Sequence, residues 1–169
     1  IYNNGIVKGL CGSDYMLMEF PMDKYSKTYL DIIYELSLLG VKPIIAHPER
    51  YLYIIEDMEL INTFIGEGFL FQLNSGSITG GFGRRVEKTA RRLIEAGACH
   101  FIVSDAHSIG IRCTGLNDAM NITNKISTYV GANMQRNAQL LLINEKIPND
   151  SYKVFQKKNF FSIFKKNQY

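Results

Sequence analysis

Four short apolar segments of this chain each lead into side chains that can bind a metal ion. YMLMEF contains Glu19, PIIAHPER contains His47, FLFQLN ends in Asn74, and HFIVSDAH ends in Asp105 and His107. Glu19, His47, Asn74 and Asp105 follow one another at intervals of 28, 27 and 31 residues. A strand, a helix and their connections take about 30 residues. The spacing therefore predicts successive parallel strands whose carboxyl ends carry ligands to one point.

Length and composition indicate one globular domain. A chain of 169 residues with 46% hydrophobic and 21% charged residues can form one sizeable core and is too short for two ordinary domains. Three unclustered cysteines indicate neither a disulfide framework nor a thiolate zinc site, which favours a reducing cytoplasm. No apolar run approaches the ~20 residues of a membrane span, and we expect no secretory leader.

The formal net charge of +3 is unevenly distributed. Residues 151–169 carry five lysines and no acidic residue, so residues 1–150 have a formal charge of −2. A nucleic-acid groove needs basic and aromatic side chains spread over a folded face, so we expect no nucleic-acid partner. The expected organisation is a folded part at 1–150 and a basic, aromatic, disordered tail at 151–169. The functional alternative for the tail is transient contact with an anionic membrane surface.

Helical periodicity separates the apolar segments. Helices are predicted at 29–39, 56–66, 84–96 and 116–130, with Gly131 as the break before a last helical stretch through 142. Strands are predicted at 15–19, 43–47, 69–74 and 100–104. These strands are short and apolar on both faces, as is typical of a parallel sheet buried on both sides. A complete eight-fold barrel takes about 250 residues, so we expect an open sheet or part of a barrel.

The candidate ligands differ in how specific they are. Asp105 and His107 stand two residues apart after an apolar run, so both can reach one ion; the alternative is a helix-capping aspartate beside a surface histidine. His47 alone would more often be a hydrogen-bonded packing residue. Glu19 lies among methionine, leucine and phenylalanine, where a carboxylate is costly to desolvate without a cation. His100, at the start of a strand, is expected to be structural.

Two arginines follow the candidate ligands at the same expected rim. Arg50 stands three residues after His47, and Arg112 five after His107. Guanidinium groups hold a phosphoryl dianion through paired hydrogen bonds, and the alternative for each arginine is a surface salt bridge. The Gly-rich stretch 76–83 lacks the P-loop lysine and the dinucleotide spacing, so we expect a loop that lines the pocket. No cysteinyl-phosphate motif and no G-x-S-x-G motif occurs, which excludes those nucleophilic routes.

Taken in order, YMLMEFP, IIAHPERY, FQLNSGSITGGFG and HFIVSDAHSIGIR resemble a known family. It comprises the bacterial manganese-dependent protein-tyrosine phosphatases of the polymerase-and-histidinol-phosphatase (PHP) superfamily, the CpsB/YwqE type encoded with capsule and exopolysaccharide genes. The resemblance covers about residues 5–145 and implies an α/β fold, a partial, distorted, TIM-like (β/α)7 barrel with divalent metals at the carboxyl ends of its parallel strands. It implies metal-ligating roles for Glu19, His47, Asp105 and His107, and phosphate-contacting catalytic roles for Arg50 and Arg112.

The resemblance also implies an activity and a partner. The activity is metal-dependent hydrolysis of phosphotyrosine on a protein, with about two or three Mn²⁺ or other divalent ions in the complete enzyme. The implied substrate is a membrane-associated tyrosine autokinase of polysaccharide synthesis.

One departure from the family pattern matters. The family begins with an H-x-H strand and further ligands that nothing before Glu19 supplies, so we expect an N-terminally truncated chain. We expect the parent protein to be active, and this isolated chain to bind metal weakly, if at all, and to have little or no activity. Two alternatives stay open: another PHP phosphoesterase, such as a histidinol-phosphate phosphatase, and a non-catalytic binding remnant.

Overall fold

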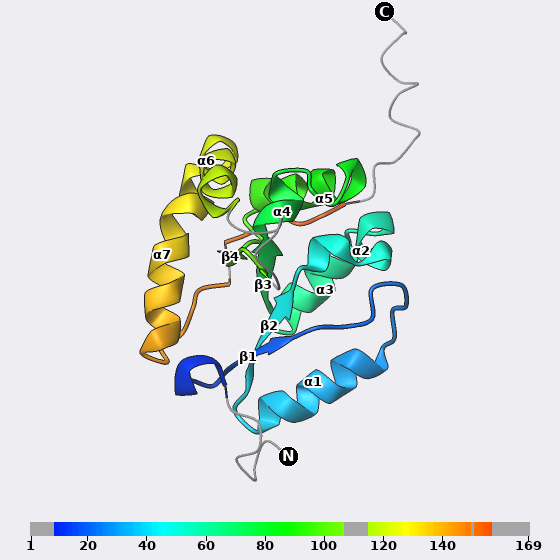
Figure 1. Cartoon of the computed structure of the whole chain (residues 1–169). Helices are drawn as coiled ribbons and strands as arrows, with labels where there is room; N and C mark the ends of the chain where they lie inside the picture. The colour runs from blue at the N-terminus through cyan, green and yellow to red at the C-terminus, as the bar shows by residue number, and fades with distance from the viewer. Residues whose placement is uncertain (1–8, 107–114, 150, 157–169) are drawn as a thin grey trace, which may run out of the picture.

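Four parallel strands form the centre of the fold in the computed structural model, which describes residues 9–106, 115–149 and 151–156 (Figure 1). The strands lie side by side in the order in which they occur in the sequence. They are β1 (Tyr15–Met18), β2 (Lys42–Ala46), β3 (Leu70–Asn74) and β4 (Phe101–Val103). Each agrees with its predicted range to within one residue at either end, and every neighbouring pair is parallel, so the expected α/β arrangement is confirmed.

Helices connect the strands and continue after the last one. They are α1 (Thr28–Leu38), α2 (Leu52–Glu56), α3 (Leu60–Gly66), α4 (Ser75–Ile78), α5 (Arg84–Ala96), α6 (Leu116–Ile126) and α7 (Thr128–Leu142), with short 3-10 turns η1 (Leu10–Gly12) and η2 (Pro48–Arg50). Helices α1 and α5 match their predictions closely. The helix predicted at 56–66 begins only at Leu60, because Asp57 has an extended backbone that separates it from α2. The Gly-rich stretch, predicted as a loop, begins inside α4.

The break in the last helical region lies at Ser127, and the predicted break at Gly131 is wrong. Ser127 has an extended backbone (φ −151°, ψ 104°), and its hydroxyl accepts the N–H of Val130 in the first turn of α7. Gly131 lies inside α7, where a Cβ would collide with the side chain of Asn124 in α6. The serine therefore caps α7, and the glycine allows the two helices to approach closely.

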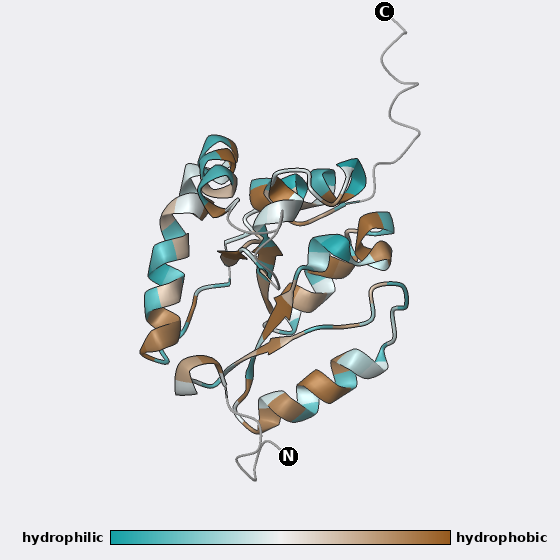
Figure 2. Ribbon diagram, viewed as in Figure 1, coloured by the Kyte–Doolittle hydropathy of each residue, from teal (hydrophilic) through white to brown (hydrophobic). Residues whose placement is uncertain are grey.

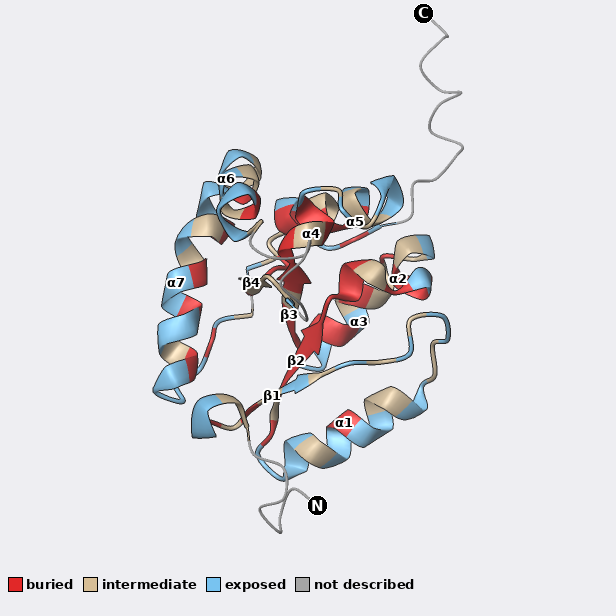
Figure 3. Cartoon of the chain, in the orientation of Figure 1, coloured by how far each residue is buried: buried red, intermediate tan, exposed pale blue. Residues whose placement is uncertain are grey.

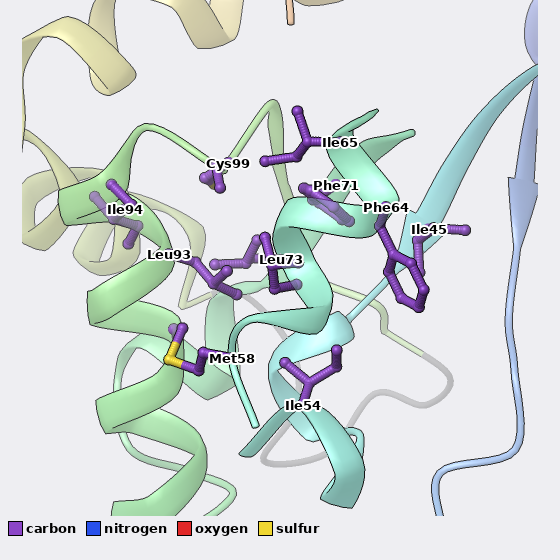
Figure 4. Packing of buried hydrophobic residues seen from close by; sticks show 14 of the residues in the cluster. Ile45, Ile54, Met58, Phe64, Ile65, Phe71, Leu73, Leu93, Ile94 and Cys99 are labelled. Carbon is purple, nitrogen blue, oxygen red and sulfur yellow. The ribbon is translucent and has the colours of Figure 1, made fainter. Parts of the chain in front are cut away.

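The main hydrophobic core lies between one face of the sheet and the helices that cover it (Figure 4). Ile45 of β2 and Phe71 and Leu73 of β3 are completely buried there, together with Phe64 of α3 and Leu93 of α5. Complete burial of such a side chain contributes about 1.5–3 kcal/mol, so this face fixes the strands against the helices. Figure 2 shows β2 and β3 as apolar and α5 as polar on its outer side, and Figure 3 shows the matching pattern of burial.

The opposite face of the sheet is covered only in part. A smaller apolar cluster on this side consists of Tyr15, Ile44, Leu70, Leu141 and Ile147. Leu17 of β1, which pairs in register with Ile44, is 41% exposed. The prediction that every strand is buried on both faces therefore fits β2 and β3 but is wrong for β1, and all three residues of β4 are only partly buried.

The folded body continues into residues 151–156, contrary to the boundary predicted from composition. The Lys153 N–H donates to the Ala96 carbonyl at 2.7 Å, and Asn62 exchanges two hydrogen bonds with the backbone of Phe155. The Phe155 side chain is 7% exposed and belongs to the main core. One buried aromatic ring with satisfied backbone groups outweighs the polar, basic composition of this segment.

No helix in the described ranges is both long and apolar enough to cross a membrane. Residues 157–169 lie outside those ranges, so the disorder and membrane contact predicted for this part of the tail stay predictions.

Candidate metal and phosphate site

The carboxyl ends of β1 and β2 bring a carboxylate and a histidine together. Glu19 directly follows β1, His47 directly follows β2, and the two strands pair in parallel. His47 Nε2 lies 3.5 Å from Glu19 Oε1. Two donors that bind one cation at about 2.0–2.2 Å lie roughly 3.0–3.5 Å apart, so this pair is spaced as ligands of a shared ion would be.

The two side chains of this pair differ in burial. The His47 side chain is 5% exposed, and burial lowers its pKa, with the Glu19 carboxylate partly opposing the shift. Burial therefore favours the neutral imidazole, which is the form that binds cations. The Glu19 side chain is 58% exposed. We expected the apolar neighbours of Glu19 to bury its carboxylate, so that a cation would be needed to offset the cost of desolvation. This is wrong, because the described residues leave this part of β1 partly exposed.

Two candidate ligands have a left-handed backbone conformation. The φ angle is 34° at His47 and 50° at Asp105, a region that residues other than glycine seldom adopt. Such conformations persist only where surrounding contacts impose them, and they cluster at functional sites. At His47 the backbone N–H donates to the Gln72 carbonyl at 2.7 Å, which extends the pairing of β2 with β3 by one residue.

The carboxylate of Asp105, two residues after β4, contacts two neighbouring loops. Asn74, the last residue of β3, donates its Nδ2–H to Asp105 Oδ2 at 2.8 Å. Nη1 of Arg50 lies 3.9 Å from the same oxygen, and the Arg50 and Asp105 side chains are 22% and 29% exposed. Arg50 and Asp105 thus lie at one rim, as expected, while their roles stay predictions.

An aromatic ring supports the Arg50 guanidinium. The guanidinium carbon lies 4.5 Å from the centroid of the Phe82 ring, within the range of a cation–π interaction. The Phe82 ring in turn lies against Gly76, where an added Cβ would come within 2.9 Å of it. This contact places the Gly-rich stretch beside the candidate phosphate-binding arginine.

Glu49 lies between His47 and Arg50 and is completely buried. Its Oε1 accepts the backbone N–H of Asn74 at 3.0 Å. Burial raises the pKa of Glu49 to about 7, and hydrogen bonding offsets this in part. Sequence reasoning missed Glu49 and Phe82. The available signals were an acidic residue close behind the apolar run Pro43–Ala46, where burial would require a hydrogen-bond partner, and the single aromatic residue of the Gly-rich stretch.

The expected four-ligand cluster is seen only in part. In the described ranges, no three His, Cys, Asp or Glu side chains lie close enough together to hold a metal ion. Glu19 and His47 form one close pair. The negative charge of Asp105, which follows β4, partly offsets the lowering of the His47 pKa by burial. His107 and Arg112 lie outside the described ranges.

Sequence comparison places the chain among known proteins. The family described as "Capsular polysaccharide synthesis, CpsB/CapC" matches residues 2–144. CapC of Staphylococcus aureus is 36% identical over 163 residues, which are 93% of this chain and 63% of that protein. The tyrosine-protein phosphatase YwqE of Bacillus subtilis is 33% identical over 151 residues, which are 89% of this chain and 59% of YwqE.

Structural comparison gives the same result. One solved structure, from the crystallographic description of YwqE from Bacillus subtilis and CpsB from Streptococcus pneumoniae as metal-dependent tyrosine phosphatases, is 31% identical to this chain. The match has a TM-score of 0.86 and covers 92% of this chain and 64% of that structure. The chain therefore has the α/β fold of part of a PHP-type barrel. The chain belongs to the CpsB/CapC family, and it spans about three fifths of the length of the relatives compared above.

Proposed function

We propose that this chain is part of a metal-dependent protein-tyrosine phosphatase of capsular polysaccharide synthesis, acting in the cytoplasm on a phosphotyrosine protein. The family match and the name of YwqE as a tyrosine-protein phosphatase support this proposal. The observation that carries it is the pairing at the carboxyl edge of the sheet. There His47 lies 3.5 Å from Glu19, and Arg50 lies 3.9 Å from Asp105.

The side chains at this edge fit divalent cations. Carboxylate and imidazole are ligands that suit Mn²⁺ and similar ions. The buried Nδ1 of His47 has no hydrogen-bond partner in the described ranges, and its Nε2 faces a carboxylate. Glu19, His47 and Asp105 would hold the ions, with His107 as the fourth predicted ligand. When bound, such cations lower the pKa of coordinated water towards ~7 and offset charge on phosphoryl oxygens.

Arg50 binds the phosphoryl group in this proposal. Its 3.9 Å separation from Asp105 is too long for a hydrogen bond, so its donors can turn to an incoming anion. Guanidinium groups bind phosphate through two parallel hydrogen bonds, and the contact with Phe82 restricts the orientation of this one. Arg112 is the second predicted phosphate contact. A phenol leaving group, with a pKa of about 10, needs less proton donation than an alkoxide, so this chain need not supply a strong general acid.

A chimera tests the proposed function, because this chain spans only 59% of YwqE. In the chimera this chain replaces the matching part of YwqE. We expect Mn²⁺-dependent hydrolysis of a phosphotyrosine peptide that EDTA abolishes and that His47→Ala lowers by about 100-fold or more. Faster hydrolysis of histidinol phosphate would favour another PHP phosphoesterase. A folded chimera without turnover would favour a non-catalytic binding remnant.

The proposed protein partner is a membrane-associated tyrosine autokinase, and the basic tail would bring the chain to the same surface. Four lysines lie beyond residue 156, and each contributes about 1 kcal/mol near an anionic membrane. Co-sedimentation with phosphatidylserine vesicles should pellet the full chain more than residues 1–156. Equal pelleting of the two would rule out membrane attachment by the tail.

A further inference from the structure

A connected set of buried polar groups ties together the loops after β2, β3 and β4. Glu49 and Asn74 are both completely buried. Glu49 Oε1 accepts the backbone N–H of Asn74 at 3.0 Å, and the Asn74 side chain donates to Asp105 Oδ2 at 2.8 Å. Neither Glu49 nor Asn74 has a role in the function proposed above.

We propose that Asn74 is a positioning residue for the Asp105 carboxylate, and that Glu49 fixes Asn74 in the backbone position which this contact requires. The inference rests on the proposed function in one respect, namely that Asp105 binds a cation.

The backbone conformation of Asp105 is consistent with such a contact. Its φ of 50° lies in the left-handed region, which aspartate adopts more readily than most residues other than glycine, and a contact with its carboxylate helps to keep it there. A hydrogen bond to a carboxylate is about twice as strong as one between neutral groups. Asn74 supplies such a bond from the last residue of β3, which pairs in register with Val103 of β4. Asn74 thereby links the orientation of the carboxylate to the sheet.

Asn74 also keeps Asp105 apart from Arg50. Both side chains approach the same oxygen, Oδ2, but Asn74 does so at 2.8 Å and Arg50 at 3.9 Å. Without the Asn74 amide, the guanidinium would be the nearer of these two donors to Oδ2, and we expect the carboxylate to turn towards it. One side chain thus keeps Asp105 in place for a cation and Arg50 in place for phosphate.

Glu49 acts one step further from the ion. Its contact with Asn74 is to a backbone N–H, so Glu49 helps to fix the position of the last residue of β3 on the side away from β4. A glutamine has an oxygen at the same place and can accept the same bond, whereas a leucine cannot. Glu49→Gln should therefore preserve the positioning, and Glu49→Leu should remove it.

The first test compares two buried asparagines: Asn74, at the carboxyl end of β3, and Asn137 of α7, which contacts the residue before β4. Asn137 is buried and donates its Nδ2–H to the His100 carbonyl at 3.0 Å, so Asn137→Ala removes a similar hydrogen bond far from the candidate ligands. Mn²⁺ binding to the full chain is measured by electron paramagnetic resonance of free Mn²⁺. We expect Asn74→Ala to raise the Kd for Mn²⁺ about 10- to 100-fold and Asn137→Ala to leave it unchanged, although both lower the Tm.

The glutamate variants complete this test. Glu49→Gln should bind Mn²⁺ like the wild-type chain, and Glu49→Leu should bind it as weakly as Asn74→Ala. Equal Kd values for Asn74→Ala and Asn137→Ala would overturn the proposal, because the asparagine would then act on stability alone.

A second measurement does not depend on metal binding. In the metal-free chain, the ¹³C resonance of the Asp105 carboxyl group should shift in Asn74→Ala and stay in place in Asn137→Ala. An unmoved resonance in Asn74→Ala would overturn the positioning role. A wild-type chain that binds no Mn²⁺ would refute the cation site of the proposed function, while the ¹³C shift would still decide whether Asn74 orients Asp105.

Discussion

His100 illustrates, at the scale of a single residue, how burial fixes a protonation state. The side chain lies at the amino end of β4, where its Nδ1 accepts the backbone N–H of Phe71 at 3.0 Å. Its carbonyl accepts the amide of Asn137. Burial lowers the pKa of His100 to about 4. The expectation that this histidine is structural is confirmed, because its buried ring binds the backbone of β3 and its carbonyl binds α7.

This protonation state makes the stability of the fold depend on pH. His100 binds a proton with a pKa of about 4 when folded and about 6.5 when unfolded, so the unfolded chain binds more protons between these values. The free energy of unfolding should therefore fall as the pH drops from 6.5 to 4, by about 3 kcal/mol from this residue.

Urea unfolding at pH 7 and pH 4.5 measures this effect. In His100→Asn, the side-chain oxygen can replace Nδ1 as the acceptor for Phe71, but the variant cannot titrate in this range. The wild-type chain should lose about 2–3 kcal/mol more than the variant between the two pH values. The same loss in both proteins would mean that His100 does not contribute.

Residue identities in the sequence predicted part of the candidate site. Ligand chemistry and the spacing of about 30 residues, which is that of a strand–helix unit, were enough to place His47, Asp105 and Arg50 at one edge of a parallel sheet. The contacts of Glu49 and Asn74 could not be predicted, because they depend on the register between β2 and β3. The exposure of Glu19 could not be predicted either, because it depends on whether another part of the protein covers β1.

At the scale of secondary-structure elements, the junction of α6 and α7 shows a limit of reading helices from residue type. Gly131 was expected to break the helix, because glycine has low helix propensity. Here its missing side chain makes room for Asn124 instead, and Ser127 separates the helices as an N-cap. The strands and the strongly amphipathic α5 were predicted correctly, because their patterns follow from burial against the core.

The capping role of Ser127 has a measurable cost. Ser127→Ala removes the acceptor for the Val130 N–H and should lower the free energy of unfolding by about 1 kcal/mol. Ser127→Asp, which can accept the same bond and carries a charge favourable to a helix N-terminus, should retain the wild-type stability. Chemical unfolding of both variants checks this. A Ser127→Asp variant as unstable as Ser127→Ala would exclude capping as the cause.

At the scale of the whole molecule, one face of the sheet is fully covered in the described body and the other is covered only in part. The helix-covered face holds the main core, and the segment 151–156 completes it with Phe155. The opposite face leaves Leu17 exposed beside Glu19. The chain spans 63% of CapC. In the described ranges Glu19 and His47 form a close pair that no third His, Cys, Asp or Glu joins, and the weak metal binding expected of the chain stays a prediction.

The role of the segment 151–156 can be tested by truncation. Phe155→Ala should lower the free energy of unfolding by about 3 kcal/mol, because a buried ring is lost from the core. A chain ending at residue 150 should lose at least as much, and one ending at 156 should unfold like the full chain. Equal stability of the chains ending at 150 and 156 would show that the segment does not contribute to the fold.

The most direct test of the central claim is the Mn²⁺ affinity of the chain after removal of single candidate ligands. Isothermal titration should show weak, saturable Mn²⁺ binding that His47→Ala and Asp105→Ala each weaken about tenfold or more. Asp14→Ala, which removes an acid paired with Lys42 at the amino edge of the sheet, should leave the affinity unchanged. If all three variants bind Mn²⁺ as the wild-type chain does, the carboxyl edge is not the metal site.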